Sequence, residues 1–364
     1  MKTLSSLPDQ TGRAQSAAEA KSHAEALKMK PLTSRTFPHV RMRRLRQSDS
    51  LRDMVRENHV RKEDLVYPLF VEEEIDQRLP IGAMPGVFRE TEKSLEKVVK
   101  DSAAAGVRAL MLFGVSHHKD HTGSDSMTPG GLLSRIIDRA KQAAPEMTVI
   151  ADTCFCEYTD HGHCGPLDAR GDVDNDATLE NISMQAVISA EAGADMIAPS
   201  GMMDGQISAI RHTLDMAGFS HVPIMAYAAK FASVFYGPFR EAAGCSLGHI
   251  PNVRKDRKTY QMDPANGREE LRDALLDEQE GADILMVKPG MPYLDVLARL
   301  RQKTDIPLAV YQVSGEYAML KHAAAAGALN YEDALMESLL AFKRAGADMI
   351  LTYGSLDACR LLDK

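Results

Sequence analysis

Short apolar runs alternate with longer amphipathic stretches from residue 60 to the C-terminus. Eight runs rich in β-branched and other apolar residues follow one another, at residues 65–71, 109–115, 148–155, 195–200, 222–228, 283–289, 307–313 and 348–354. The stretches between them have apolar residues at helical spacing, most clearly at 94–107, 177–194 and 331–347. Regular strand–helix alternation is typical of an α/β protein with a parallel sheet.

Glycine precedes three of the predicted strands. The sequences "EAGAD", "EGAD" and "RAGAD" place Gly193, Gly281 and Gly346 where a left-handed residue would end a helix. Eight strand–helix units predict a closed (β/α)₈ TIM barrel, in which active sites lie at the carboxyl ends of the strands. An open doubly wound sheet is the alternative, but the chain has no G-x-G-x-x-G turn.

The composition fits a barrel enzyme that works in water. A chain of 364 residues, 44% of them hydrophobic, can bury such a core, and we assign residues 61–364 to it. The net charge of -8 gives no indication of nucleic-acid binding, and no apolar run approaches the length of a membrane span. Five cysteines, an odd number, without an apolar signal-peptide core predict a reducing, cytoplasmic location.

The N-terminal region differs from the rest in charge. Residues 1–50 contain ten Lys/Arg and four Asp/Glu, a net charge of +6, which leaves -14 on the remainder. We interpret residues 1–35 as a mobile extension and residues 36–60 as a basic arm, densest in the run "RMRRLRQ". Because no aromatic residues interleave with these arginines, we expect the arm to pack on an acidic neighbouring subunit or to stay solvated rather than to bind RNA.

Two lysines lie where neighbouring strands are predicted to end. Lys230 follows the fifth apolar run and Lys288 closes the sixth, so both amines should reach the same end of the barrel. A lone lysine at a strand end is usually a solvated surface residue. Two on adjacent strands would be partly buried and would repel each other, and both effects lower the pKa of an amine. A neutral amine is a nucleophile that forms Schiff bases with ketones and aldehydes.

The third predicted strand runs into "CFCEYTDHGHC". Cys154 and Cys156 would face the same side of an extended segment, and a loop could return Cys164 to them. Three thiolates with an open fourth position suit a catalytic Zn²⁺, but the spacing alone leaves unrelated thiols equally open. His161 and His163 could be a fourth ligand, a proton carrier or ordinary loop residues.

Polar residues follow the other strands near the same mouth. A long loop after the fifth strand would form a lid, and arginines on it could pair with a carboxylate, although a solvated basic loop is the plainer interpretation. The candidates on this loop and after the last two strands are Arg240, Arg254, Arg257, Lys258, Ser314 and Tyr353. The residues together indicate an enzyme whose substrate carries both a carbonyl and a carboxylate.

The chain resembles the porphobilinogen synthases, also called 5-aminolevulinate dehydratases, from about Arg41 to its C-terminus. The motifs that carry the resemblance occur in the family's order: "YPLFV", "DTCFCEYTDHGHCG", "APSGMMDG", "YAAKFASVFYGPFREA", "LMVKPGMPYLD" and "YQVSGEYAM". The resemblance implies a hydro-lyase of tetrapyrrole and haem biosynthesis. It condenses two molecules of 5-aminolevulinate to porphobilinogen with loss of two waters.

The resemblance also implies a role for each candidate residue. Lys288 would hold the first substrate, with its carboxylate on Ser314 and Tyr353, and Lys230 would hold the second. Lid arginines bind the second carboxylate in this family, and the matching residues here are Arg240 and Arg257. The thiols that match the family's zinc triad are Cys154, Cys156 and Cys164, and the zinc is thought to bind the second substrate's amino group.

The chain departs from the family pattern at several positions. Asp273 stands where some members have a glutamate that binds an activating Mg²⁺, and Gly201 where many have a carboxylate, which leaves Asp152 as a candidate acid or base. The lid segment is longer than usual, so Arg254 is an alternative to Arg257. Beyond Tyr353 the tail departs from the family's usual ending. We expect the thiols outside the triad, Cys245 and Cys359, to be unligated, and the family implies a homo-octamer clasped by N-terminal arms.

Two other functions are compatible with these residues. A class I aldolase on the same barrel would need only Lys288 and would be indifferent to zinc. A degenerate barrel that binds zinc as a scaffold would form no imine with 5-aminolevulinate.

Overall fold

The computed structural model describes residues 40–247 and 250–364, so the extension predicted for residues 1–35 lies outside the described residues. The chain divides into two units after Glu57, whereas we expected the arm to end at residue 60. In the first unit, η1 (Met42–Arg46) is a 3₁₀ turn and α2 (Asp49–Met54) is a short helix, and neither has a buried residue. Ser48 caps α2 by accepting a hydrogen bond from Leu51 N at 3.3 Å.

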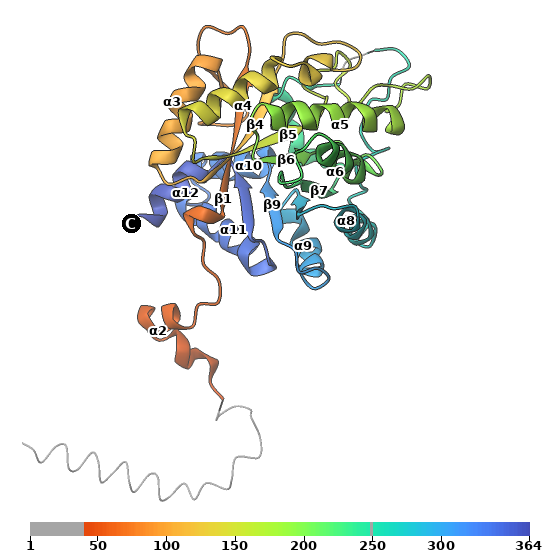
Figure 1. Cartoon of the computed structure of the whole chain (residues 1–364). Coiled ribbons are helices and arrows are strands. Elements are labelled where there is room, and N and C mark those ends of the chain that lie inside the picture. Colours follow the sequence, from red (N-terminus) through yellow and green to blue (C-terminus); the bar gives the residue numbers. More distant parts are fainter. Residues whose placement is uncertain (1–39, 248–249) are drawn as a thin grey trace, which may run out of the picture. The chain divides into compact units, whose positions relative to one another are not determined.

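The second unit is a barrel of eight parallel strands in the order β6-β5-β4-β1-β10-β9-β8-β7 (Figure 1). The two ends of this row meet where Ile197 and Ile224 form a parallel bridge, with Ile197 N donating to Pro223 O at 3.0 Å. The strands are β1 (Leu65–Glu72), β4 (Ala109–Val115), β5 (Thr148–Thr153), β6 (Met196–Pro199), β7 (Met225–Lys230), β8 (Ile284–Lys288), β9 (Leu308–Gln312) and β10 (Met349–Thr352). The predicted (β/α)₈ barrel is confirmed.

Helices cover the outside of the strands (Figure 1). They are α3 (Glu92–Ala104), α4 (Leu132–Ala143), α5 (Asn175–Glu191), α6 (Gln206–Met216), α7 (Gly237–Ala242), α8 (Glu269–Gln279), α9 (Leu294–Arg301), α10 (Ser314–Ala325), α11 (Tyr331–Ala345) and α12 (Ser355–Leu362). The glycines after α5, α8 and α11 adopt positive φ angles of 98°, 107° and 111°. This conformation ends each helix and lets the next strand begin at once, as predicted.

The strands β2 (Leu79–Pro80) and β3 (Phe88–Glu90) form a small hairpin that the apolar pattern did not indicate, because two or three residues are too few to show a period. β3 also pairs with β1.

The core has two layers, as the alternation of side chains along a strand requires. Aliphatic residues of the outward faces pack against the helices. The inward faces fill the barrel with larger side chains, among them Phe70, Phe113, Tyr227, Tyr311 and Tyr353. Burial of each such side chain stabilises the fold by roughly 1.5–3 kcal/mol before the entropy cost of ordering it. These rings form the floor beneath the carboxyl ends of the strands.

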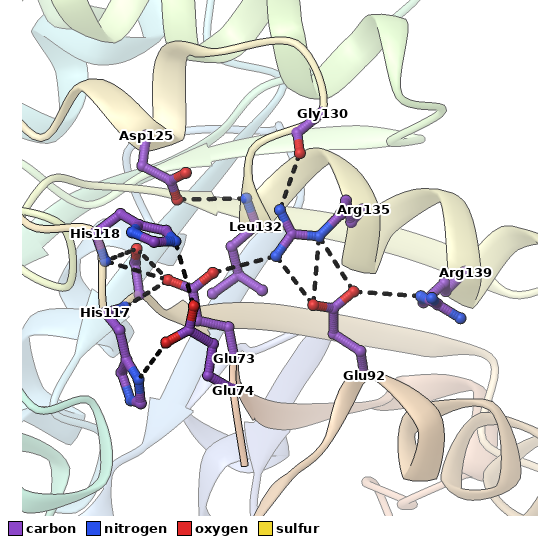
Figure 2. Close-up of polar contacts among 11 residues, drawn as sticks. Glu73, Glu74, Glu92, His117, His118, Asp125, Gly130, Leu132, Arg135 and Arg139 are labelled. Atoms are coloured by element: carbon purple, nitrogen blue, oxygen red, sulfur yellow. Dashed lines mark hydrogen bonds and ion pairs between the residues drawn. The ribbon is translucent and has the colours of Figure 1, made fainter. Parts of the chain in front are cut away.

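A polar network fixes the rim of the barrel where β1 and β4 end (Figure 2). The Glu73 carboxylate accepts hydrogen bonds from Ser116 Oγ at 2.8 Å and from the backbone N–H groups of His117 and His118. Arg135 on α4 joins it at 3.2 Å and also pairs with Glu92 at the start of α3. Burial would raise the pKa of Glu73, but these hydrogen bonds hold it below its usual value. The network ties two strand ends to two helices.

Candidate functional site

Lys230 and Lys288 are the last residues of β7 and β8, and they are paired in register across the two strands. Both side chains are buried at the carboxyl end of the barrel. Lys230 Nζ donates a hydrogen bond to Ser200 O at 2.5 Å. The structure therefore brings the two predicted lysines together in one pocket.

Aromatic rings surround the Lys288 amine. Its Nζ lies 4.2 Å from the ring centre of Tyr311 and 4.8 Å from that of Tyr227, with Tyr236 and Phe239 slightly farther away. Burial, together with the charge of Lys230, lowers the pKa of Lys288 to about 7. A substantial fraction of this amine is neutral at neutral pH, which is the form that attacks a carbonyl.

Asp152, the candidate acid or base, lies on β5, and its carboxyl group lines the same pocket as the two lysines. Its carboxylate accepts hydrogen bonds from Tyr227 OH at 2.8 Å and from Ser200 Oγ at 3.2 Å. Burial raises the pKa of Asp152 to about 6, as does the neighbouring Cys154 thiol. A carboxyl group with this pKa can both give and take a proton near neutral pH.

The three thiols of the sequence "CFCEYTDHGHC" converge beside the lysines. β5 ends at Thr153, so Cys154 and Cys156 lie on the turn that follows it, and a loop through Gly162, with a φ angle of 77°, returns Cys164. The three buried sulfurs lie within 4.8 Å of one another, and those of Cys154 and Cys156 are 3.6 Å apart. Zinc–sulfur bonds of about 2.3 Å in a tetrahedron would set sulfurs roughly 3.8 Å apart, so the cluster could hold a metal.

The protonation of the cluster suits a cation. Hydrogen bonds from Cys154 and Cys156 hold the pKa of Cys164 well below its usual value, while the pKa of Cys156 is raised well above it by the same contacts. Cys164 is therefore the thiol of the group that ionises most readily. A dication at this point would favour ionisation of the other two sulfurs.

His161 and His163 have their ring nitrogens engaged elsewhere. His163 contacts Tyr260 OH and Arg254 O, both at 2.9 Å. His161 contacts His121 O and the backbone N–H of His163, both at 3.1 Å. Neither ring belongs to the three-thiol cluster.

Cys245 lies nearer to the cluster than its sequence position indicated. Its thiol hydrogen-bonds with Cys156 and with Arg257, and these contacts with the charge of Arg257 lower the pKa of Cys245 to about 6. It is not one of the three sulfurs that lie close enough together to share a cation. The sequence could not reveal this contact, because the lid brings Cys245 back over a long loop. Cys359 is buried on α12, away from this site.

Arg257 is the lid arginine that reaches the pocket. It is 6% exposed, and its guanidinium group donates to Gly162 O at 2.7 Å and to Cys245 O at 3.0 Å. Arg254 is instead exposed and pairs with Asp172 at 3.3 Å. The pocket is narrow, with a cavity volume of about 20 Å³, and is lined by Phe113, Asp152, Cys156, Glu157, Cys164, Ser200, Lys230, Tyr236, Phe239, Arg257, Gln261 and Lys288.

The other predicted substrate contacts lie outside the lining of this pocket. Arg240, on α7, is exposed. Ser314 begins α10, where its hydroxyl accepts from Phe239 N at 2.9 Å. The Tyr353 hydroxyl is 3.0 Å from that of Tyr311, on the floor of the barrel. Ser314 and Tyr353 are buried, whereas Arg240 is exposed and is not among the residues that line the pocket.

Asp273 lies on α8, in a separate acidic cluster. Burial and the neighbouring charges of Asp204, Glu269 and Glu280 raise its pKa to about 6. Among the described residues, no group of three close metal-ligating side chains includes Asp273. A magnesium site there stays a prediction.

Glu157 is a pocket residue that the sequence interpretation missed. The Cys156 thiol donates to Glu157 Oε2 at 3.1 Å, and Glu157 Oε1 is buried without a hydrogen-bond partner. Burial raises the pKa of Glu157 well above its usual value. The available signal was its place directly after Cys156, but an acidic residue in a loop usually faces water.

Within the described residues, no helix has the length and apolar character that crossing a membrane requires. Residues 39–361 match the model of the delta-aminolevulinic acid dehydratase family. The chain is similar to the delta-aminolevulinic acid dehydratase of Escherichia coli, with 56% identity over 317 residues that cover 87% of this chain and 96% of that protein. It is also similar to the Staphylococcus aureus protein of the same name, with 49% identity over 89% of this chain and 99% of the other.

A solved structure has the same fold and 45% sequence identity. It is the delta-aminolevulinic acid dehydratase, or porphobilinogen synthase, of Toxoplasma gondii in complex with the reaction product porphobilinogen. The TM-score is 0.85, and the match covers 88% of this chain and 91% of that one.

Proposed function

The chain belongs to the delta-aminolevulinic acid dehydratase family, and on that premise we propose how its own residues carry out the condensation. The activity is that of a lyase, which joins two molecules of 5-aminolevulinate to form porphobilinogen and two waters. The observation that carries the proposal is the register pairing of Lys230 and Lys288 at the ends of β7 and β8.

Each lysine forms a Schiff base with the ketone of one substrate. The neutral amine of Lys288 attacks the carbonyl carbon, the carbonyl oxygen leaves as water, and a C=N bond remains. A pKa of about 7 supports this role, because the neutral amine is then available without extreme pH. Lys230 binds the second substrate in the same manner, from the neighbouring strand.

The carboxylates of the two substrates select the orientation. Arg257 and Arg240 take the carboxylate of the second substrate, after movement of the lid, and Ser314 and Tyr353 take that of the first. Holding two identical molecules in fixed, different orientations removes much of the entropic cost of joining them. The two lysines thus bind different substrate molecules because different carboxylate-binding residues lie around each of them.

Proton transfer falls to Asp152. Its carboxyl group lies beside both amines, hydrogen-bonded to Tyr227 and Ser200, and its pKa of about 6 lets it shuttle protons near neutral pH. Glu157 is a second buried carboxyl group in the same pocket.

We propose that Cys154, Cys156 and Cys164 hold a Zn²⁺ ion, which when bound would keep an amine in its neutral form. The close approach of the three sulfurs and the lowered pKa of Cys164 support this metal. An activating Mg²⁺ on Asp273, assembly into an octamer through the basic arm, and a cytoplasmic location remain predictions.

Incubation with 5-aminolevulinate and assay for porphobilinogen, with and without a chelator, tests the proposal. We expect product under zinc-replete, reducing conditions and little after chelation. No product under the first condition would contradict the proposed function. Full activity after complete zinc removal would contradict only the metal assignment. An aldolase would tolerate loss of Lys230, and a scaffold would bind zinc without making product.

A further inference from the structure

A second group of metal-ligating side chains lies outside the three thiols. His121, Asp160 and His161 each offer one ligand atom, and the three atoms lie within 4.8 Å of one another. The rings of His121 and His161 meet edge to face, with centroids 5.3 Å apart. His121 and Asp160 are exposed, whereas His161 is 2% exposed. The group therefore has one fixed buried member and two members that water and ions can reach.

Two loops supply these residues, and backbone hydrogen bonds hold the loops together. Asp120 N donates to Tyr158 O at 3.2 Å, and Asp160 N donates to Asp120 O at 3.0 Å. The Asp120 side chain accepts from the backbone N–H groups of residues 122–124, which shapes the turn after His121. The start of the same loop is fixed by Glu73, as Figure 2 shows. The approach of the three ligands is therefore built into the fold.

The hydrogen bonds of His161 determine its tautomer. A backbone N–H can only donate, so the contact from His163 N makes Nδ1 of His161 an acceptor. The proton must then be on Nε2, which donates to the carbonyl of His121 at 3.1 Å. Donation of one ring N–H to a backbone carbonyl is the usual arrangement behind a metal-bound histidine, because it directs the lone pair of the other nitrogen.

The exposed members have no competing partners. Neither the His121 ring nor the Asp160 carboxylate makes a hydrogen bond or an ion pair with any other side chain in the described ranges 40–247 and 250–364. By contrast, the carboxylates of Glu73 and Asp120 at this rim accept several hydrogen bonds that fix loops. The ligand atoms of His121 and Asp160 thus lie close to a buried histidine whose ring orientation is fixed by its hydrogen bonds.

We propose that His121, Asp160 and His161 form a second cation site, of two imidazoles and one carboxylate, which takes Zn²⁺ independently of the three thiols. This ligand set suits zinc, with water completing a tetrahedron. Metal–ligand distances of about 2.0–2.2 Å would bring the three atoms to roughly 3.3 Å from one another, so small rotations of His121 and Asp160 must accompany binding. Metal binding at Nδ1 of His161 would replace the hydrogen bond that this nitrogen accepts from His163 N.

The bound ion would connect the loop after β4 to the loop that ends in Cys164. It would therefore restrain the segment that presents the thiols, without being a ligand of the substrate. This role is distinct from the proposed function, because loss of the second ion leaves the lysines and thiols in place.

Metal titration of the full-length protein tests the site. The apo protein is loaded with Zn²⁺ or with Co²⁺ and its metal content is measured after gel filtration. The variant H121A/D160N is compared with H212A/D215N, which removes the same two residue types from the exposed face of α6. We expect H121A/D160N to bind one equivalent less per chain than the unaltered protein and than the control.

The absorption of the Co²⁺ form shows which site is lost. Thiolate ligands give Co²⁺ an intense charge-transfer band, whereas imidazole and carboxylate ligands do not. We expect the band to be unchanged in H121A/D160N and lost in C154A/C156A/C164A. Equal metal content in H121A/D160N and the unaltered protein would overturn the proposal. A loss of the thiolate band in H121A/D160N would overturn it as well, since the missing ion would then be the one on the thiols.

Discussion

The pocket at the ends of β7 and β8 and the rim network around Glu73 both contain partly or fully buried charged groups, but their charges are balanced differently. In the rim, Glu73 has several donors and a cation beside it, and its pKa falls. In the pocket, Lys288 has aromatic rings around it and another lysine nearby, and its pKa falls because its charged form is disfavoured. A charged group that has hydrogen-bond donors and an opposite charge beside it stays ionised and fixes a loop. A buried group without such partners is held in its neutral, reactive form.

Removal of a pocket lysine should give the largest effect on activity. Lys288→Ala should lower kcat/KM by roughly 10⁴-fold or more, because the nucleophile is lost. Its stability should change little, since a buried and poorly satisfied amine is removed. Steady-state porphobilinogen formation and chemical denaturation measure the two effects. Lys303→Ala, at an exposed lysine after α9, is the control and should retain full activity.

Removal of one thiol from the cluster should come next. Cys154→Ala should weaken metal retention by more than about 100-fold and reduce activity in parallel, because it removes a direct ligand, whereas loss of a supporting residue typically costs about 10–100-fold. Metal content and product formation are measured on the same sample. Cys359→Ala, which also removes a buried thiol, should keep both. A Cys154→Ala protein with normal metal content would contradict the assignment of the triad.

Arg257 is buried at the pocket, whereas Arg254 is exposed, so their removal should have different effects. Arg257→Ala should lower kcat/KM by roughly 10–100-fold, because a charged hydrogen-bond donor to a carboxylate is worth about 1.5–3 kcal/mol. Arg254→Ala should change it by less than about threefold, since its ion pair with Asp172 is exposed. Substrate saturation curves distinguish them. Equal losses in both variants would show that the lid uses the two residues together.

The pocket charges predict a pH dependence. Because the pKa of Lys288 is about 7, the neutral amine is scarce below that pH, so the rate of imine formation should rise about tenfold per pH unit toward pH 7 and level off above it. Asp152→Asn removes a negative charge that favours the ammonium form, so the midpoint should move to lower pH. Rapid-mixing measurement of imine formation across pH 5–9 tests the sign. A rate that still rises about tenfold per pH unit at pH 9, as the usual lysine pKa of about 10.4 requires, would contradict this prediction.

A change in the rim should affect stability more than catalysis. Arg135→Ala removes the cation shared by Glu73 and Glu92, and we expect a loss of about 1 kcal/mol because the arginine is partly exposed. Activity should stay within about twofold. Denaturant unfolding and the product assay, with Lys97→Ala as an exposed ion-pair control, compare the two properties.

The strands were predictable because their apolar residues follow a regular pattern, and the two lysines were predictable because they stand at the ends of strands. Each apolar run became a strand, and Lys230 and Lys288 are where the end of a strand must place them. Contacts made by loops were not predictable. The choice of Arg257 over Arg254, and the approach of Cys245 to Cys156, depend on how a long lid folds back. His121 joins Asp160 and His161 only because backbone pairing aligns two separate loops.

The pairing of two nucleophilic lysines is the central claim, and trapping of both imines tests it. The enzyme is incubated with 5-aminolevulinate, reduced with borohydride, digested and analysed by mass spectrometry. We expect a reduced substrate adduct on the peptide that contains Lys288 and, at saturating substrate, a second adduct on the peptide that contains Lys230. Adducts on Lys288 alone, with full product formation by Lys230→Ala, would contradict it.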